Sequence, residues 1–133
     1  MNGEARATSA IPTVLIVDDE PDVCWALERI LNACGILVVT TTRGHAALRL
    51  ASGRPFRLAF VNARLPDGDG LDLARRIRET ATGLRIVLIS GYFHGEDAEV
   101  VAALAAGTIH RFVSKPFLHE EIRTIARDAL TRP

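Results

Sequence analysis

The chain has 133 residues, a length typical of one domain, and 48% of them are hydrophobic, which favours a packed core over disorder. Sixteen basic residues balance sixteen acidic ones, so the charge balance favours neither nucleic acid nor an anionic membrane nor an acidic substrate as a partner. No apolar run approaches the length of a membrane span. We expect a flexible N-terminal tail at 1–12, followed by one domain at 13–131.

The two cysteines bear on the cellular compartment. If Cys24 and Cys34 share one helix, they lie about 15 Å apart along it, which is too far for a disulfide. Two unpaired cysteines without a secretion signal favour a reducing, cytoplasmic setting.

Short apolar runs alternate with segments of helical periodicity along the whole chain. The runs that predict strands are 13–17, 36–42, 58–61, 84–89 and 109–113. Helices are predicted from Pro21 to Gly35, over 44–51, from 71 to about 82, over 97–106 and after Pro116. Five strand–helix repeats predict βαβ crossovers and a parallel sheet with helices on both faces. The fold class is therefore α/β, a flavodoxin-like (βα)5 three-layer sandwich with strand order 2-1-3-4-5.

Polar residues follow four of the five predicted strands. Asp18 and Asp19 follow the first strand, Asn62 the third, Ser90 the fourth and Lys115 the fifth. Because the carboxyl ends of parallel strands meet at one edge of a sheet, we expect these side chains to converge there. Adjacent carboxylates repel each other unless a cation joins them, and an oxygen-rich pocket of this kind suits Mg²⁺. A hydroxyl and an ammonium beside it would bind phosphoryl oxygens. A simpler alternative is that the two aspartates only cap the first helix.

Lys115 is unusual in this chain. It is the only lysine, since the other fifteen basic residues are arginines. A chain so biased towards arginine that keeps one lysine at a strand end suggests a site that needs a compact ammonium on a flexible stem.

Four motifs give the chain a specific resemblance. They are VLIVDDEP at the first strand, LPDGDG after the third, LISGY at the fourth and RFVSKPF at the fifth. Together they resemble a bacterial response-regulator receiver domain of two-component and phosphorelay signalling, from about residue 13 to 130. The stretch WALERIL is also similar to receivers of transcriptional activators of the nitrogen-regulator type.

The resemblance assigns roles to the residues at the strand ends. The position of the phosphoacceptor aspartate, four residues before the proline of the LP motif, holds Asn62. The segment 107–111 is one residue longer than the commonest pattern. The remaining roles implied by the family are metal binding by Asp18, Asp19 and the backbone carbonyl of Arg64, switching by Ser90 and Phe112, and phosphate sensing by Lys115. The side-chain oxygen of Asn62 can still act as a further ligand of the metal.

Asn62 changes what the site is expected to do. Covalent phosphorylation needs an ionised carboxylate as nucleophile, so we expect no phosphotransfer at Asn62 and no catalytic residue in the chain. One charge pair at about 4 Å is worth up to about 4 kcal/mol at an intermediate dielectric, so Mg²⁺ is expected to bind more weakly. The metal-free fold should be more stable than an aspartate version, and Lys115 should pair with Asp18 or Asp19.

Several readings stay open. The first is a pseudo-receiver that acts through protein contacts, with a histidine kinase, an output protein or a second copy on the helix 4–strand 5–helix 5 face, residues 96–130. The second is a conventional receiver whose aspartate has been replaced, naturally or by design. A third is an enzyme-like receiver that is phosphorylated at another residue, such as Asp67, Asp69 or Ser90, although both aspartates are expected to form a turn and face solvent. A flavodoxin-like binder of a small ligand would need a phosphate-cradling loop after the first strand. This chain has Asp-Asp-Glu-Pro there instead, which disfavours that function.

Overall fold

The computed structural model describes residues 13–131, and the predicted tail at 1–12 lies outside them. Five parallel strands form the central sheet in the order β2-β1-β3-β6-β7. Counted along the main sheet alone, this is the predicted order 2-1-3-4-5, so the fold class is confirmed. The strands are β1 (Val14–Val17), β2 (Val38–Thr41), β3 (Leu58–Asn62), β6 (Arg85–Ser90) and β7 (Arg111–Ser114).

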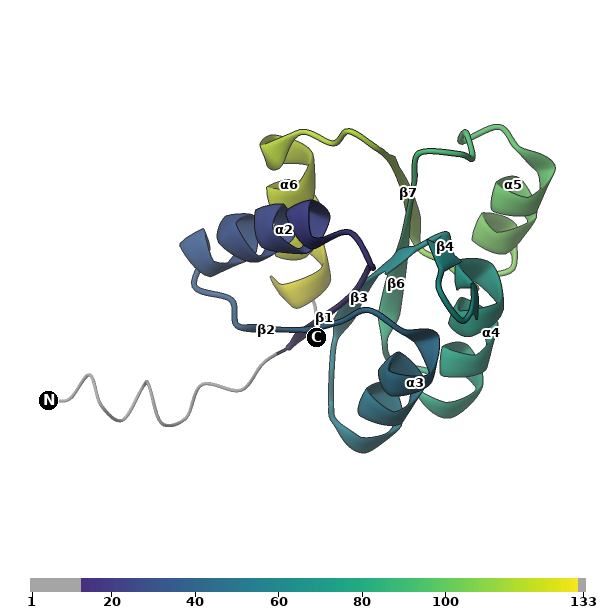
Figure 1. Ribbon diagram of the computed structural model, residues 1–133, viewed down its shortest axis with the longest axis horizontal. Helices are drawn as coiled ribbons and strands as arrows, with labels where there is room; N and C mark the ends of the chain where they lie inside the picture. The colour runs from purple at the N-terminus through teal and green to yellow at the C-terminus, as the bar shows by residue number, and fades with distance from the viewer. Residues whose placement is uncertain (1–12, 132–133) are drawn as a thin grey trace, which may run out of the picture.

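Helices cover both faces of the sheet (Figure 1). On one face lie α2 (Pro21–Ala33) and α6 (His119–Thr131). On the other lie α3 (Gly44–Gly53), α4 (Gly70–Thr80) and α5 (Ala98–Ala105). Strand side chains alternate between these layers, so Leu15 and Val17 of β1 join the core under α3 and α4, while Val14 and Ile16 join the core under α2 and α6.

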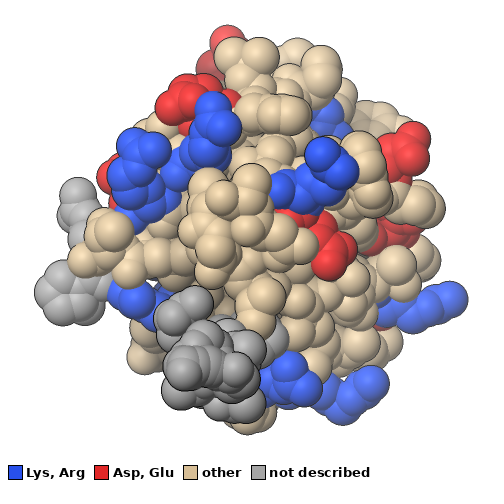
Figure 2. Space-filling view, turned by 90° about the vertical axis from the view of Figure 1, so that its left-hand side faces the viewer, with Lys and Arg blue, Asp and Glu red and all other residues tan. Residues whose placement is uncertain are grey.

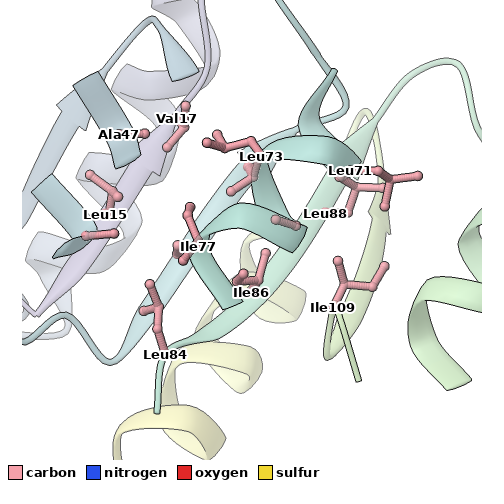
Figure 3. Close-up of a cluster of buried hydrophobic side chains, with 14 of the residues drawn as sticks. Leu15, Val17, Ala47, Leu71, Leu73, Ile77, Leu84, Ile86, Leu88 and Ile109 are labelled. Carbon is pink, nitrogen blue, oxygen red and sulfur yellow. The ribbon is translucent and has the colours of Figure 1, made fainter. Parts of the chain in front are cut away.

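The larger of the two cores lies between the sheet and helices α3 to α5. Figure 3 shows Leu73 and Ile77 of α4 packed against side chains of β1 and β6. The apolar run of β3 is fully buried because helices cover both of its faces, as its unbroken hydrophobic sequence predicts.

The outer surface agrees with the balanced composition. On the face that carries α2, β2 and α6, basic and acidic side chains are interspersed among large uncharged areas (Figure 2). None of the helices within residues 13–131 combines the length and apolarity needed to cross a bilayer.

Some local features differ from the predicted elements. The LPDGDG turn contains a small antiparallel ladder between β4 (Arg64–Leu65) and β5 (Gly68–Asp69). The last strand begins two residues later than expected, at Arg111. The reason is that the Nδ1 atom of His110, rather than a backbone carbonyl, accepts the N–H of Ile86 at 3.3 Å.

Candidate functional site

The carboxyl edge of the sheet brings together the polar residues that follow its strands. Asp18, Asn62 and Ser90 are at most 8% exposed. Such burial is unusual for polar side chains and indicates a functional site. Asn62, Ser90 and Lys115 line a depression of about 440 Å³, together with the exposed Asp19. Four of the predicted strand-end residues thus share one cavity, and Asp18 lies directly behind it against Lys115.

Asn62 is held in place by the loop that follows it. The residue ends β3, and the next backbone N–H, that of Ala63, donates to the carbonyl of Ile89 on β6 at 2.9 Å. The side-chain Nδ2 donates to the backbone carbonyl of Arg64 at 2.7 Å. A carbonyl only accepts, so this bond fixes which end of the amide faces Arg64. The carbonyl that the family resemblance assigns to metal binding therefore already accepts one hydrogen bond, from this amide.

Lys115 lies between two carboxylates. Its Nζ is 3.1 Å from Oδ2 of Asp18 and 2.6 Å from Oε1 of Glu20. The structure therefore contains the expected pairing with Asp18 but not one with Asp19. The partnership with Glu20 was not predicted. The signal for it was a third acidic residue directly after the Asp-Asp pair, where the chain turns as the N–H of Glu20 donates to Oδ1 of Asp18 at 2.9 Å.

The electrostatics of this group favour a charged lysine. Burial alone would lower the pKa of Lys115, but the hydrogen bond to Glu20 and the charge of Asp18 together raise it above its ordinary value. Burial raises the pKa of Asp18, and the N–H of Glu20 and the charge of Lys115 offset only part of that effect. The lysine has two carboxylate partners whereas Asp18 has one cation, which accounts for the asymmetry.

Ser90 organises the loop after β6. Its Oγ accepts hydrogen bonds from the backbone N–H groups of Tyr92 and Phe93, both at 2.9 Å. These two bonds use the lone pairs of the oxygen, so the hydroxyl can act towards a ligand only as a donor. Phe112, the proposed switch aromatic, is half-buried and packs against the core cluster on the α3–α5 face rather than lining the depression.

A cation–π contact lies at the mouth of the depression. The guanidinium of Arg64 sits 4.2 Å from the ring centroid of Tyr92, and both residues line the cavity. Nothing in the sequence pattern indicated this pair, because the contact depends on how the loops after β3 and β6 approach each other.

The two aspartates of the turn have structural roles. Asp67 accepts the N–H of Gly44 at 2.8 Å and of His45 at 3.0 Å, which caps α3 from a distant part of the chain and lowers the pKa of this carboxyl. Asp69 caps α4 through the N–H of Leu71 at 2.7 Å. The expectation that Asp67 faces solvent is wrong, since its side chain is only 15% exposed. Neither aspartate lines the depression beside Asn62.

The donor set fits Mg²⁺ only in part. The Oδ2 atom of Asp18 is buried and its only near partner is the Lys115 ammonium at 3.1 Å, so a hard cation at this carboxylate would compete with the lysine. Asp19 would supply a second carboxylate. The carbonyl of Arg64 already accepts one hydrogen bond from Asn62, and the described part of the chain holds no cluster of three Asp, Glu, His or Cys residues with metal-binding geometry.

Comparison with known proteins agrees with this geometry. Residues 14–127 match the response regulator receiver domain family. The chain belongs to that family. Its relatives include the transcriptional regulatory protein KdpE of Mycobacterium tuberculosis, 34% identical over 90% of this chain and 51% of KdpE. The response regulator protein PilR of Pseudomonas aeruginosa is 34% identical over 87% of this chain and 25% of PilR. The chain thus spans about half the length, or less, of these curated relatives.

Solved receiver structures have the same fold. The receiver domain of NtrX from Brucella abortus superposes with a TM-score of 0.78 at 29% identity, covering 90% of this chain and 99% of that one. A CheY-like receiver from Methanospirillum hungatei gives a TM-score of 0.82 at 20% identity, covering 92% of this chain and 95% of that one, and shows the fold alone. As a response regulator receiver domain, the chain is a regulatory signalling domain of a two-component system.

Proposed function

We propose that this receiver domain is a pseudo-receiver, which signals through protein contacts without being phosphorylated. The observation that carries the proposal is the hydrogen bond from Nδ2 of Asn62 to the carbonyl of Arg64. We take Asn62 to stand at the position of the nucleophilic carboxylate of the family, and this bond directs its amide nitrogen towards the carbonyl that the resemblance assigns to metal binding.

Two physical consequences support this proposal. An amide oxygen carries no full negative charge, so it does not attack phosphorus to form a stable acyl phosphate. The pocket also has one negative charge fewer than an aspartate version would have, so Mg²⁺ binds more weakly. When bound, the ion would supply charge neutralisation for an incoming phosphoryl group.

A second candidate is a conventional receiver in which the aspartate has been replaced. The chain retains Asp18 at the position that the resemblance assigns to metal binding, and Ser90 and Lys115 at those assigned to the phosphoryl group, which supports it. The matching relatives carry the names of ordinary response regulators. In this case the Asn62→Asp variant would have the full reaction, and Asn62 would hold the domain in one state.

The partner is proposed to be a protein that binds the face formed by α5, β7 and α6. Val101 and Leu104 on α5 are 49% and 38% exposed, and α5 carries only one charged side chain, Glu99. An apolar helix surface of this kind suits a histidine kinase, an output protein or a second copy of the chain. We propose no direct nucleic-acid contact and a cytoplasmic location, which the free thiols of Cys24 and Cys34 support.

The chemistry is tested with acetyl phosphate and Mg²⁺, followed by intact-mass measurement. The pseudo-receiver should gain no phosphoryl group, whereas Asn62→Asp should gain one. A stable phosphoryl adduct on the unaltered chain would overturn the proposal, and peptide mapping would then identify the residue. Whether a second copy of the chain is the partner is tested by analytical ultracentrifugation of the chain and of its Val101→Glu variant. A charge on that face should abolish any dimer that the unaltered chain forms.

A further inference from the structure

A cleft lies at the other end of the sheet, away from Asn62. Its volume is about 320 Å³, within the range of small-molecule sites. It opens between the first residues of β3, β6 and β7 and the second half of α6. Its floor is apolar and consists of Leu58, Val87, Ile125 and Ala129.

The rim of the cleft carries cations. Arg111 is paired with Asp128, at 3.2 Å between Nη2 and Oδ2. Arg85 is half-buried, and its guanidinium has neither an ion pair nor a hydrogen bond to any residue within 13–131. His110 completes the rim, and its Nδ1 faces the N–H of Ile86.

A half-buried guanidinium without a counter-ion is energetically unfavourable. Arg85 is partly removed from water, and His110 beside it on the rim has its pKa lowered by burial and by the charges of Arg78 and Arg85. The surroundings of Arg85 therefore favour an added negative charge. Guanidinium groups match carboxylates geometrically and bind them with two parallel hydrogen bonds.

We propose that this cleft binds a small organic anion with a flat apolar body, in which a carboxylate pairs with Arg85. The body would lie on the floor formed by Leu58, Val87 and Ile125. Asp128 also lines the cleft, and its negative charge repels an anionic ligand. It also holds Arg111 in an ion pair, so Arg111 is less available to the ligand. The site thus takes an aromatic or similarly compact carboxylate rather than a neutral compound of the same shape.

The cleft is independent of the function proposed for Asn62. Leu58 begins β3 and Asn62 ends it, so the two sites lie about 13 Å apart along one strand. The cleft shares no lining residue with the depression at the carboxyl edge. Failure of one proposal therefore leaves the other intact.

The test is an NMR titration of the whole chain with 2-naphthoate, and with 2-naphthamide as its neutral match. Methyl signals of Leu58, Val87 and Ile125 should shift and saturate with the anion, and the amide should bind about tenfold or more weakly, since hydrogen bonds to charged groups are worth about 1.5–3 kcal/mol. Arg85→Met should weaken the binding of naphthoate by a similar factor. Arg49→Met on the exposed surface of α3 makes the same charge change and should have no effect.

Two further variants keep the test decisive. Arg85→Lys retains the charge and should bind naphthoate better than Arg85→Met does. Asp128→Asn frees Arg111 and removes a repulsive charge, so it should tighten binding several-fold. Equal binding of acid and amide, unchanged affinity in Arg85→Met and Asp128→Asn, or shifts confined to the residues around Lys115 would overturn the proposal.

Discussion

Lys115 is held by Glu20, whose Oε1 lies 2.6 Å from the lysine Nζ. The two residues are 95 positions apart in the sequence, and the contact joins the loop after β1 to the end of β7. Glu20 is 57% exposed at its side chain, whereas Asp18, the other partner, is almost fully buried. The ammonium thus bridges one buried and one largely exposed carboxylate at the sheet edge.

We expect Glu20→Gln to remove one ion pair of Lys115 and to leave its ion pair with Asp18. The pKa of Lys115 should fall, because the hydrogen bond to Glu20 is the largest of the effects that raise it. The free energy of unfolding should change by less than about 1 kcal/mol, since one partner is largely exposed. The lysine pKa is measured by NMR of the Nζ and Cε signals of this only lysine. An unchanged pKa would show that the contact with Glu20 does not form in solution.

Asn62→Asp should restore the chemistry of the site at a cost in metal-free stability. The new carboxylate adds a charge near Asp18, so Mg²⁺ affinity should rise about tenfold or more, given that one charge pair is worth up to about 4 kcal/mol. The same charge repels Asp18 without metal, so the free energy of unfolding in EDTA should fall. Calorimetric Mg²⁺ titration and urea unfolding with and without EDTA measure both effects.

A second variant separates restored chemistry from general metal binding. Lys115→Gln in the Asn62→Asp background should keep most of the Mg²⁺ affinity and lose most of the reaction with acetyl phosphate, since the ammonium binds phosphoryl oxygens. An inert Asn62→Asp protein with tightened Mg²⁺ binding would show that the Arg64–Tyr92 contact or the pairing of Lys115 with Glu20 blocks the reaction with the phosphodonor.

The fold could be predicted because hydrophobic periodicity and strand–helix alternation leave few arrangements. The fully apolar run of β3 requires cover on both faces, and Gly35 has the positive φ of +79° that a helix end of this kind needs. The late start of β7 was not predictable, since it depends on a side chain, that of His110, taking the place of a backbone acceptor.

The site was predictable in its members but not in its pairings. Asp18, Asn62 and Lys115 lie at the carboxyl edge of the sheet because each follows or ends a parallel strand, and this does not depend on the paths of the loops. The partner of Lys115 and the direction of the Asn62 amide depend on loop paths that no periodicity encodes. Asp67 shows the same limit, since its cap on α3 joins segments 23 residues apart.

Gly70 is expected to be irreplaceable for the geometry beside Asn62. A Cβ at this position would lie 2.1 Å from the backbone oxygen of Asn62 and 2.9 Å from Cα of Ala63, so the start of α4 or the end of β3 would have to move. Gly70→Ala should therefore lower the free energy of unfolding by about 1–3 kcal/mol or more. Gly53→Ala is the matched control, because nothing lies within 4 Å of its added Cβ, and it should be neutral or slightly stabilising. Equal urea midpoints for the two variants would contradict the close approach.

His110 should make the fold sensitive to mild acid. Its Nδ1 faces the N–H of Ile86 at 3.3 Å and Arg78 Nη2 at 3.4 Å, which requires the neutral ring with the proton on Nε2. Burial, with the charges of Arg78 and Arg85, lowers the pKa of His110 below its ordinary value of 6.5. The folded state therefore binds fewer protons than the unfolded state, so the contribution of His110 to stability is complete above about pH 6.5 and declines as the pH falls towards its lowered pKa.

The comparison of His110→Gln with the unaltered chain isolates this effect. Glutamine keeps an acceptor for the N–H of Ile86 but does not titrate, so the variant should lose less stability between pH about 7.5 and about 5.5. Urea unfolding at both pH values measures the difference, with His94→Gln as a control for the loss of a histidine outside β7. Identical pH dependence in all three proteins would show that folding does not change the pKa of His110, and would contradict the proposed effect of its burial.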